Sequence, residues 1–259
     1  MSRSVRSRGL SVLSPLHEAL AKLRGWLAAG VAALLGAFAA FGFAPFDFTI
    51  LLVVAYVGLI WMMDGARGMP RWGRAMFMRG WAFGYGFFLV SMHWTAEPFL
   101  IDPAQHAMFL WMPLIALPGG MALIWGTAAL LAGSFWSASP SRIFIFAIAF
   151  GLAEFTRGYL FGGFPWNLAG TSWAPGSAIS QAASLGGVYW LTLMTLFAVA
   201  SPAALVDTRE TPGVVGRTVP VLIAVALVAA SWGWGAQRLS EPADMSRQHV
   251  VLMDAGVPQ

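Results

Sequence analysis

Seven long apolar runs occupy most of this sequence, and they restrict its possible folds more than any other feature. They cover residues 26–43, 48–63, 76–95, 107–133, 143–158, 178–200 and 218–235. A helix needs about 20 apolar residues to cross the hydrocarbon core of a bilayer, and about 17 is the lower limit. Charged residues make up only 10% of the chain, against about 25% in a soluble domain. The pattern predicts an all-α membrane protein, a bundle of about seven transmembrane helices.

The connections and prolines predict details of this bundle. Only residues 44–47 separate the first two runs, which indicates a tight helical hairpin. Both runs are close to the lower length limit, so we expect one or both to be short or tilted spans. Pro113 and Pro118 lie inside the fourth run, and each lacks a backbone N–H donor. These prolines predict a kink in the fourth run.

Basic residues are distributed asymmetrically between the two sets of connections. One set holds Arg3, Arg6, Arg8, Lys22, Arg24, Arg67, Arg71, Arg74, Arg79, Arg142, Arg209 and Arg217. The opposite set, residues 44–47, 96–106 and 159–177, holds none, and only Arg157 stands at its edge. Lys and Arg favour the cytoplasmic side of a membrane. We therefore expect a cytoplasmic amino terminus and, after seven crossings, an external carboxyl tail.

This orientation divides the chain into three parts. We expect a basic cytoplasmic arm over residues 1–24, a transmembrane domain over 25–236 and an extracytoplasmic tail over 237–259. A cleaved signal peptide is the alternative interpretation of the arm. The long charged leader, and the second apolar run that follows the first so closely, disfavour cleavage.

The tail contains a segment typical of a β-strand. Residues 249–253 have the composition of a strand, and Asp254, Gly256 and Pro258 that follow are turn residues. A lone strand is not stable in water. We therefore expect this segment to be the first strand of a sheet whose remainder is absent.

The most specific motif follows the fifth run, where residues 154–167 read EFTRGYLFGGFPWN. Other stretches accompany it: 43–46 (FAPF), 84–94 (GYGFFLVSMHW), Gln181 and 186–190 (GGVYW). On these motifs the sequence, from residue 26 to 259, resembles the membrane domain of the apolipoprotein N-acyltransferase family. The GFPWN segment is the most diagnostic of them.

The resemblance implies a bacterial inner-membrane enzyme of lipoprotein maturation. Such an enzyme moves an acyl chain from a phospholipid donor to the amino-terminal amine of a diacylglyceryl-modified lipoprotein acceptor. In that family a periplasmic nitrilase-like α/β domain follows the seventh span and carries a Glu, Lys and Cys triad. Residues 250–259 resemble the first strand and turn of that domain, so the triad is expected beyond Gln259.

The absence of cysteine bears on this expected chemistry. Acyl transfer through a thioester needs a thiolate nucleophile, and the 259 residues include no cysteine. We therefore predict a carboxyl-terminally truncated member of the family, without catalytic residues of its own and inactive by itself.

Two groups of residues near the fifth run are candidates for substrate binding. Glu154 and Arg157 are spaced i,i+3 and share a helix face. They either contact a phospholipid head group or form a structural ion pair. The second group, Phe164, Pro165, Trp166 and Asn167, is either an interfacial turn or a substrate contact, and the resemblance favours contact for Trp166.

A third group ends the third run on the same predicted outer side. It consists of His93, Trp94 and Glu97, whose imidazole and carboxylate can join a polar site. A lone histidine at the edge of a membrane is more often a snorkelling or hydrogen-bonded residue. With this alternative left open, the predicted substrate-binding set comprises all three groups.

Several other classes of site are not expected. The histidines, His17, His93, His106 and His249, are scattered without metal-ligand spacing, so neither a metal nor a cofactor is predicted. The net charge of +4 comes from residues between apolar runs rather than from one basic face, which excludes nucleic acid as an expected partner. The expected partners are the phospholipid donor, the lipoprotein acceptor and membrane lipids.

Two alternative functions remain. A small multi-span transporter would account for the prolines of the fourth run and for the charged pair Glu154 and Arg157. Apart from Thr127, Thr192 and Thr195, however, the centres of the runs are nearly all apolar or glycine, which argues against a solute path. A non-enzymatic membrane scaffold is the other alternative.

Overall fold

The computed structural model describes residues 13–206 and 213–242, and these residues form helices and turns without any strand. The α-helices are α1 (Leu13–Lys22), α2 (Gly25–Ala40), α3 (Ile50–Arg67), α4 (Trp72–Ser91), α5 (Pro103–His106), α6 (Leu117–Ser134), α7 (Arg142–Arg157), α8 (Ala183–Ala200) and α9 (Gly213–Ser240). Short 3-10 segments are η1 (His93–Leu100), η2 (Ala107–Phe109), η4 (Leu160–Gly162), η5 (Ala169–Ser172), η6 (Ile179–Ala182) and η7 (Ser201–Val206), and η3 (Met112–Ala116) is a π-helical turn. The all-α prediction is confirmed for this part of the chain.

Each of the seven predicted runs contains a helix. By length and composition, four segments are able to cross a membrane: Ile50–Arg67, Pro103–Ser134, Ile179–Val206 and Gly216–Ser240. The apolar helix α2 has 16 residues, and α4 and α7 each carry arginines. Seven crossings therefore remain a prediction.

The ends of the chain differ in detail from the sequence analysis. Helix α1 lies inside the predicted arm, where no helix was predicted. Helix α9 continues to Ser240, past the predicted end of the last run at residue 235. The predicted strand, residues 249–253, lies outside the described residues.

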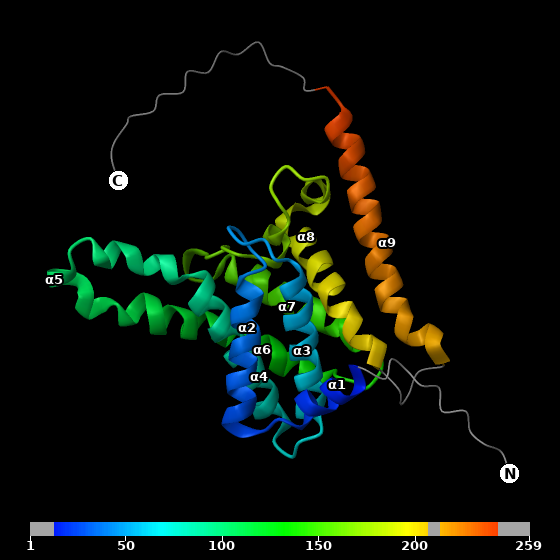
Figure 1. Ribbon diagram of the computed structural model, residues 1–259, viewed down its shortest axis with the longest axis horizontal. Helices are drawn as coiled ribbons and strands as arrows, with labels where there is room; N and C mark the ends of the chain where they lie inside the picture. The colour runs from blue at the N-terminus through cyan, green and yellow to red at the C-terminus, as the bar shows by residue number, and fades with distance from the viewer. Residues whose placement is uncertain (1–12, 207–212, 243–259) are drawn as a thin grey trace.

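The centre of the molecule is a bundle in which α4 packs against both α2 and α6, and α7 against α6 and α8 (Figure 1). Helix α9 runs along the outside, in contact with η6, η7 and α8. Aromatic side chains fill the interior, and Tyr56, Phe83 and Trp125 are almost fully buried. Buried aromatic rings contribute much of the contact area in such a core.

Small residues allow α2 and α4 to approach closely. A Cβ atom at Gly36 of α2 would collide with the backbone carbonyl of Phe83, and one at Gly86 of α4 would collide with that of Ala33. The two helices therefore lie backbone to backbone, as small residues permit in membrane bundles. Leu23, just before α2, accepts a hydrogen bond from Arg79 in the first half of α4, whereas Phe43, just after α2, packs against Phe87 near the end of α4. Helices α2 and α4 are therefore parallel and begin at the same end of the bundle.

The segment around α5 projects sideways from the bundle as a helical hairpin (Figure 1). Its second leg contains the π-helical turn η3 at Pro113, before α6 begins at Leu117. This irregular turn lies where the sequence predicted a kink. Exposed apolar side chains cover the hairpin, among them Ile101, Met108 and Trp111.

Candidate functional site

The last turn of α7 carries a buried ion pair. One guanidinium nitrogen of Arg157 lies 2.5 Å from a carboxylate oxygen of Glu154, and Arg157 Nε donates to the other oxygen at 3.2 Å. The side chains are 0% and 1% exposed, respectively. The i,i+3 spacing predicted from sequence therefore produces a bidentate pair, which is the strong form of such a contact.

Trp125 of α6 completes this pair, and the sequence analysis missed it. Its indole Nε1 donates to Oε1 of Glu154 at 2.6 Å. Aromatic rings surround the indole, with centroids at 5.0 Å for both Phe87 and Phe88. A buried tryptophan needs an acceptor for its N–H group. The sequence feature that could have predicted this contact is a tryptophan inside the fourth apolar run, since the fifth run, which follows it, contains a carboxylate.

Arg157 also holds the connection that follows α7. Its second terminal nitrogen donates to the backbone carbonyl of Phe164 at 2.6 Å and to that of Trp166 at 2.8 Å. In return, the backbone N–H of Phe164 donates to the carbonyl of Arg157 at 2.9 Å. Gly163 has a φ of 84°, which lets the chain fold back onto the end of the helix. We call residues 164–167 the aromatic loop.

The aromatic loop exposes the ring of Trp166, whereas Phe164 is partly buried against the core. Phe164 and Trp166 lie next to each other, with ring centroids 5.0 Å apart, and Trp166 is 49% exposed. Pro165 between them is exposed. The polar groups that fix this loop are therefore buried, whereas an aromatic surface is available for contact.

Asn167 ties the aromatic loop to the end of α4. Its amide Nδ2 donates to the carbonyl of Ser91 at 3.2 Å, and its backbone has a φ of 54°. Asparagine adopts this left-handed conformation more readily than most residues. The contact links the predicted group at the end of the third run with the aromatic loop.

The three predicted residues of that group lie on η1, directly after α4. His93, Trp94 and Glu97 are all exposed. The Nδ1 of His93 lies 2.7 Å from the carbonyl of Val90, so this ring nitrogen contacts the local backbone rather than the Arg157 pair. The group is thus near the aromatic loop in the fold, without belonging to the buried polar network.

An apolar groove of about 700 Å³ runs between α6 and α7 and reaches the aromatic loop. Helix α6 contributes Met121, Ile124 and Leu131, while Arg157 and Phe164 line the groove as well. Ligand pockets of this size with few polar groups suit hydrophobic molecules. The groove has the dimensions and the lining for a hydrocarbon chain.

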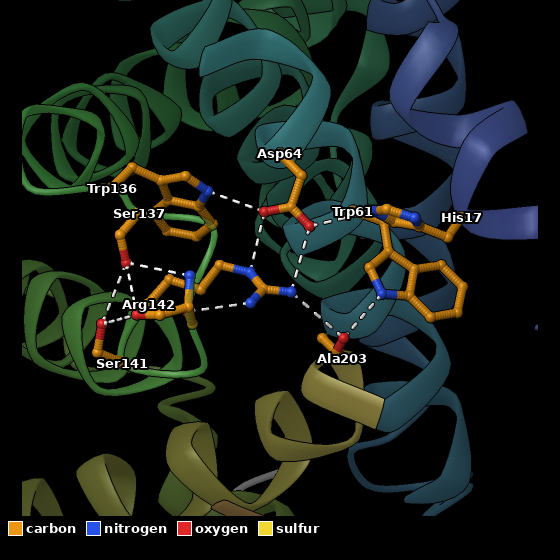
Figure 2. Close-up of polar contacts among 9 residues, drawn as sticks. His17, Trp61, Asp64, Trp136, Ser137, Ser141, Arg142 and Ala203 are labelled. Atoms are coloured by element: carbon orange, nitrogen blue, oxygen red, sulfur yellow. Dashed lines mark hydrogen bonds and ion pairs between the residues drawn. The ribbon is translucent and has the colours of Figure 1, made fainter. Parts of the chain in front are cut away.

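A second, partly buried polar cluster, drawn in Figure 2, lies at the opposite end of α7. Asp64 of α3 pairs with Nε of Arg142 at 2.9 Å and accepts a 2.9 Å hydrogen bond from Nε1 of Trp136. His17 of α1 lies 3.3 Å from the same carboxylate. In the sequence, Arg142 indicated only the orientation of the chain in the membrane. Both ends of α7 are therefore fixed by a carboxylate, an arginine and a tryptophan.

These features define a helical membrane protein in which a buried ion pair, Glu154 with Arg157, holds an exposed aromatic loop in place. Comparison with known proteins agrees with this class. The family model described as the apolipoprotein N-acyltransferase N-terminal domain matches residues 35–201. The chain belongs to this family, as the resemblance of the GFPWN motif implied.

Individual relatives carry the same name. The apolipoprotein N-acyltransferase of Caulobacter vibrioides is 38% identical over 240 residues, which cover 91% of this chain and 43% of the relative. That of Rhizobium rhizogenes is 36% identical over 224 residues, covering 85% of this chain and 41% of the relative. That of Brucella melitensis is 35% identical over 223 residues, covering 84% and 41%. The chain spans about two fifths of the length of these curated relatives.

Proposed function

We propose that this chain forms the membrane part of an apolipoprotein N-acyltransferase in the bacterial inner membrane. In this proposal residues 25–236 cross the membrane seven times. The basic arm, residues 1–24, is cytoplasmic, and residues 237–259 enter a periplasmic nitrilase-like domain. The asymmetric distribution of basic residues supports the orientation. The aromatic loop then lies at the periplasmic face.

The membrane part gathers the two lipid substrates at that face. We assign the hydrocarbon chain of the phospholipid donor, or of the diacylglyceryl lipoprotein acceptor, to the groove between α6 and α7. Trp166, Pro165 and Phe164 contact the substrate at the end of the groove. Trp94, Glu97 and His93 on η1 border the same face and interact with the polar part of a substrate.

Glu154, Arg157 and Asn167 have positioning roles in this proposal. The guanidinium of Arg157 donates hydrogen bonds to Glu154 and to two backbone carbonyls of the aromatic loop, and the amide of Asn167 donates to a carbonyl at the end of α4. These donors bind protein groups and hold the loop in place. The observation that carries the proposal is this direct connection from a buried charge to an exposed tryptophan beside an apolar groove. A preorganised contact loses less conformational entropy when a ligand binds.

The acyl-transfer step requires a nucleophile from outside these 259 residues. A thioester forms when a thiolate attacks the ester carbonyl of the phospholipid and the lysophospholipid leaves with a proton. The acceptor amine then attacks the thioester to form an amide, which breaks the carbon–sulfur bond and releases the thiolate and a proton. The 259 residues contain no cysteine, so we propose that they bind both lipids but do not turn them over.

The transporter alternative receives no support from Thr192 and Thr195, two of the three threonines near the middle of the runs. The hydroxyl of Thr195 accepts from the indole of Trp173 at 2.7 Å, and that of Thr192 accepts from the backbone of Gly170 at 3.2 Å. Both hydroxyls attach the connection before α8 to that helix. They hold protein groups together instead of lining a solute path.

Binding of a fluorescent diacylglyceryl lipopeptide to the purified chain in lipid nanodiscs tests the proposal. We expect saturable binding that Trp166→Ala weakens about tenfold or more, since a buried aromatic contact contributes over 1 kcal/mol. The matched control is Trp234→Ala, because Trp234 is also exposed, at 44%, but lies in α9. Equal effects of the two substitutions would remove Trp166 from the site.

A second measurement tests the catalytic part of the proposal. The same chain is incubated with phospholipid and lipopeptide, and triacylated product is measured by mass spectrometry. We expect no product. Turnover by these residues alone would contradict the assignment of the nucleophile to another part of the enzyme.

A further inference from the structure

A second groove, of about 290 Å³, lies between the beginnings of α2 and α4. Its apolar lining includes Trp26 of α2 and Met78 of α4. Its charged lining consists of Arg71, Arg74 and Arg79. No acidic side chain of the described residues lines it. The groove lies at the opposite end of α4 from the aromatic loop, so it is separate from the site proposed above.

Arg79 is a buried cation in this groove that has no carboxylate partner among residues 13–206 and 213–242. It is 3% exposed, and it donates to the backbone carbonyls of Leu23 at 2.8 Å and Ala75 at 3.1 Å. Its Nε is buried without a hydrogen-bond partner. By contrast, Arg142 and Arg157, which are also buried, each pair with a carboxylate. A buried charge normally requires such compensation.

The backbone adds positive potential at the same place. Gly25, the first residue of α2, lines the groove, and Arg71 is the residue that caps α4. Neither helix has a side-chain hydrogen bond at its amino-terminal cap. The first N–H groups of a helix and its dipole both favour a bound anion. Two parallel helices therefore direct their positive ends toward one groove.

We propose that this groove binds an anionic phospholipid, with the phosphate near the three arginines and part of an acyl chain along Trp26 and Met78. Trp26 is 87% exposed, so its ring is available to a lipid. A free phosphate ion would satisfy the charge and leave the apolar wall uncovered. A zwitterionic lipid would bring a second cation to a groove lined by arginines. An anionic phospholipid satisfies both parts of the lining.

The test compares lipids that differ only in head group. The 259-residue chain is purified in a nonionic detergent, and its thermal unfolding is followed during titration with phosphatidylglycerol or with phosphatidylcholine of the same acyl chains. Inorganic phosphate is titrated in a third series. We expect saturable stabilisation by phosphatidylglycerol at concentrations at least tenfold lower than for phosphatidylcholine, and none by inorganic phosphate at matched concentrations.

Substitution of the exposed arginines locates the effect. Arg71→Gln combined with Arg74→Gln should weaken the apparent affinity for phosphatidylglycerol by roughly 30-fold. This is the change expected when two basic residues that attract the anionic head group are removed. The matched control combines Lys22→Gln with Arg238→Gln, which removes the same charge. Lys22 lines a different cavity and Arg238 lies in α9. This control should keep the wild-type affinity.

Three results would overturn the proposal. Equal stabilisation by phosphatidylglycerol and phosphatidylcholine would show that the charge of the head group is not recognised. An equal loss of affinity in the two double variants would assign the effect to net charge. Stabilisation by inorganic phosphate as strong as that by phosphatidylglycerol would identify a site for the free ion. None of these results depends on the proposed acyl transfer.

Discussion

Arg157 donates a 2.8 Å hydrogen bond to the backbone carbonyl of Trp166, and so connects a buried ion pair to an exposed aromatic ring. The same guanidinium binds Glu154, whose carboxylate also accepts from Trp125. A buried charge that is both paired and hydrogen-bonded is tolerated in a membrane protein. The pair therefore acts as a rigid support from which the aromatic loop faces outward.

Removal of the arginine should destabilise the whole bundle. Arg157→Gln leaves the buried carboxylate of Glu154 without its cationic partner, which costs about 3–5 kcal/mol of unfolding free energy. Unfolding of the purified chain in detergent, followed by circular dichroism, measures this loss. Arg238→Gln, which changes an exposed arginine of α9, should have little effect.

A double variant separates the buried charge from the hydrogen bonds to the loop. Glu154→Gln combined with Arg157→Gln removes both charges, so it should be clearly more stable than Arg157→Gln alone. A double variant at least as unstable as the single variant would contradict the role of charge compensation.

Gly163 should control the position of the aromatic loop. Both Gly162 and Gly163 have positive φ, but only at Gly163 would a Cβ atom collide with the carbonyl of Gly158. Gly163→Ala should therefore displace the loop and weaken lipopeptide binding roughly tenfold. Gly162→Ala carries similar backbone strain without the collision, and serves as the control in the same binding assay. Equal binding by the two variants would disprove the effect of the collision.

Asp64 should stabilise the packing of the amino-terminal end of α7, because it pairs with Arg142 there. In Asp64→Asn the buried guanidinium of Arg142 loses its carboxylate partner, and because the Asp64 side chain is itself 18% exposed we expect a destabilisation of about 1–3 kcal/mol, less than for a fully buried pair. Thermal unfolding in detergent measures this effect. Asp47→Asn is the matched control, because Asp47 is exposed and its φ of 55° is one that asparagine also adopts. An equally small effect at both positions would mean that the pair contributes little.

A methyl group added at Gly36 should destabilise the packing of α2 against α4. Gly36→Ala places a Cβ against the backbone carbonyl of Phe83, so we expect a loss of about 1–3 kcal/mol. Gly30→Ala in the same helix meets nothing within 4 Å, and should be neutral or slightly stabilising because alanine favours helix. The difference in thermal unfolding between these two variants isolates the contact. Similar unfolding temperatures would show that the two helices can move apart at little cost.

The sequence alone determined the helical class, the approximate positions of the helices in the seven apolar runs, and the family. Apolar runs and the turn residues that bound them are local features of the chain, so they can be recognised without a structure. The pairing of Glu154 with Arg157 was also accessible, because a spacing of three residues on a helix brings side chains together. The exposure of Trp166 was consistent with its predicted place on the outward connection.

Only the tertiary structure decided which distant residues share a polar cluster. Trp125 reaches Glu154 from 29 positions away, and Asp64 reaches Arg142 from 78. The pattern of basic residues treated Arg79 and Arg142 alike, yet one has a carboxylate partner and the other has none in the described residues. Local sequence encodes which segments become helices, whereas the packing of those helices sets which buried charges are compensated.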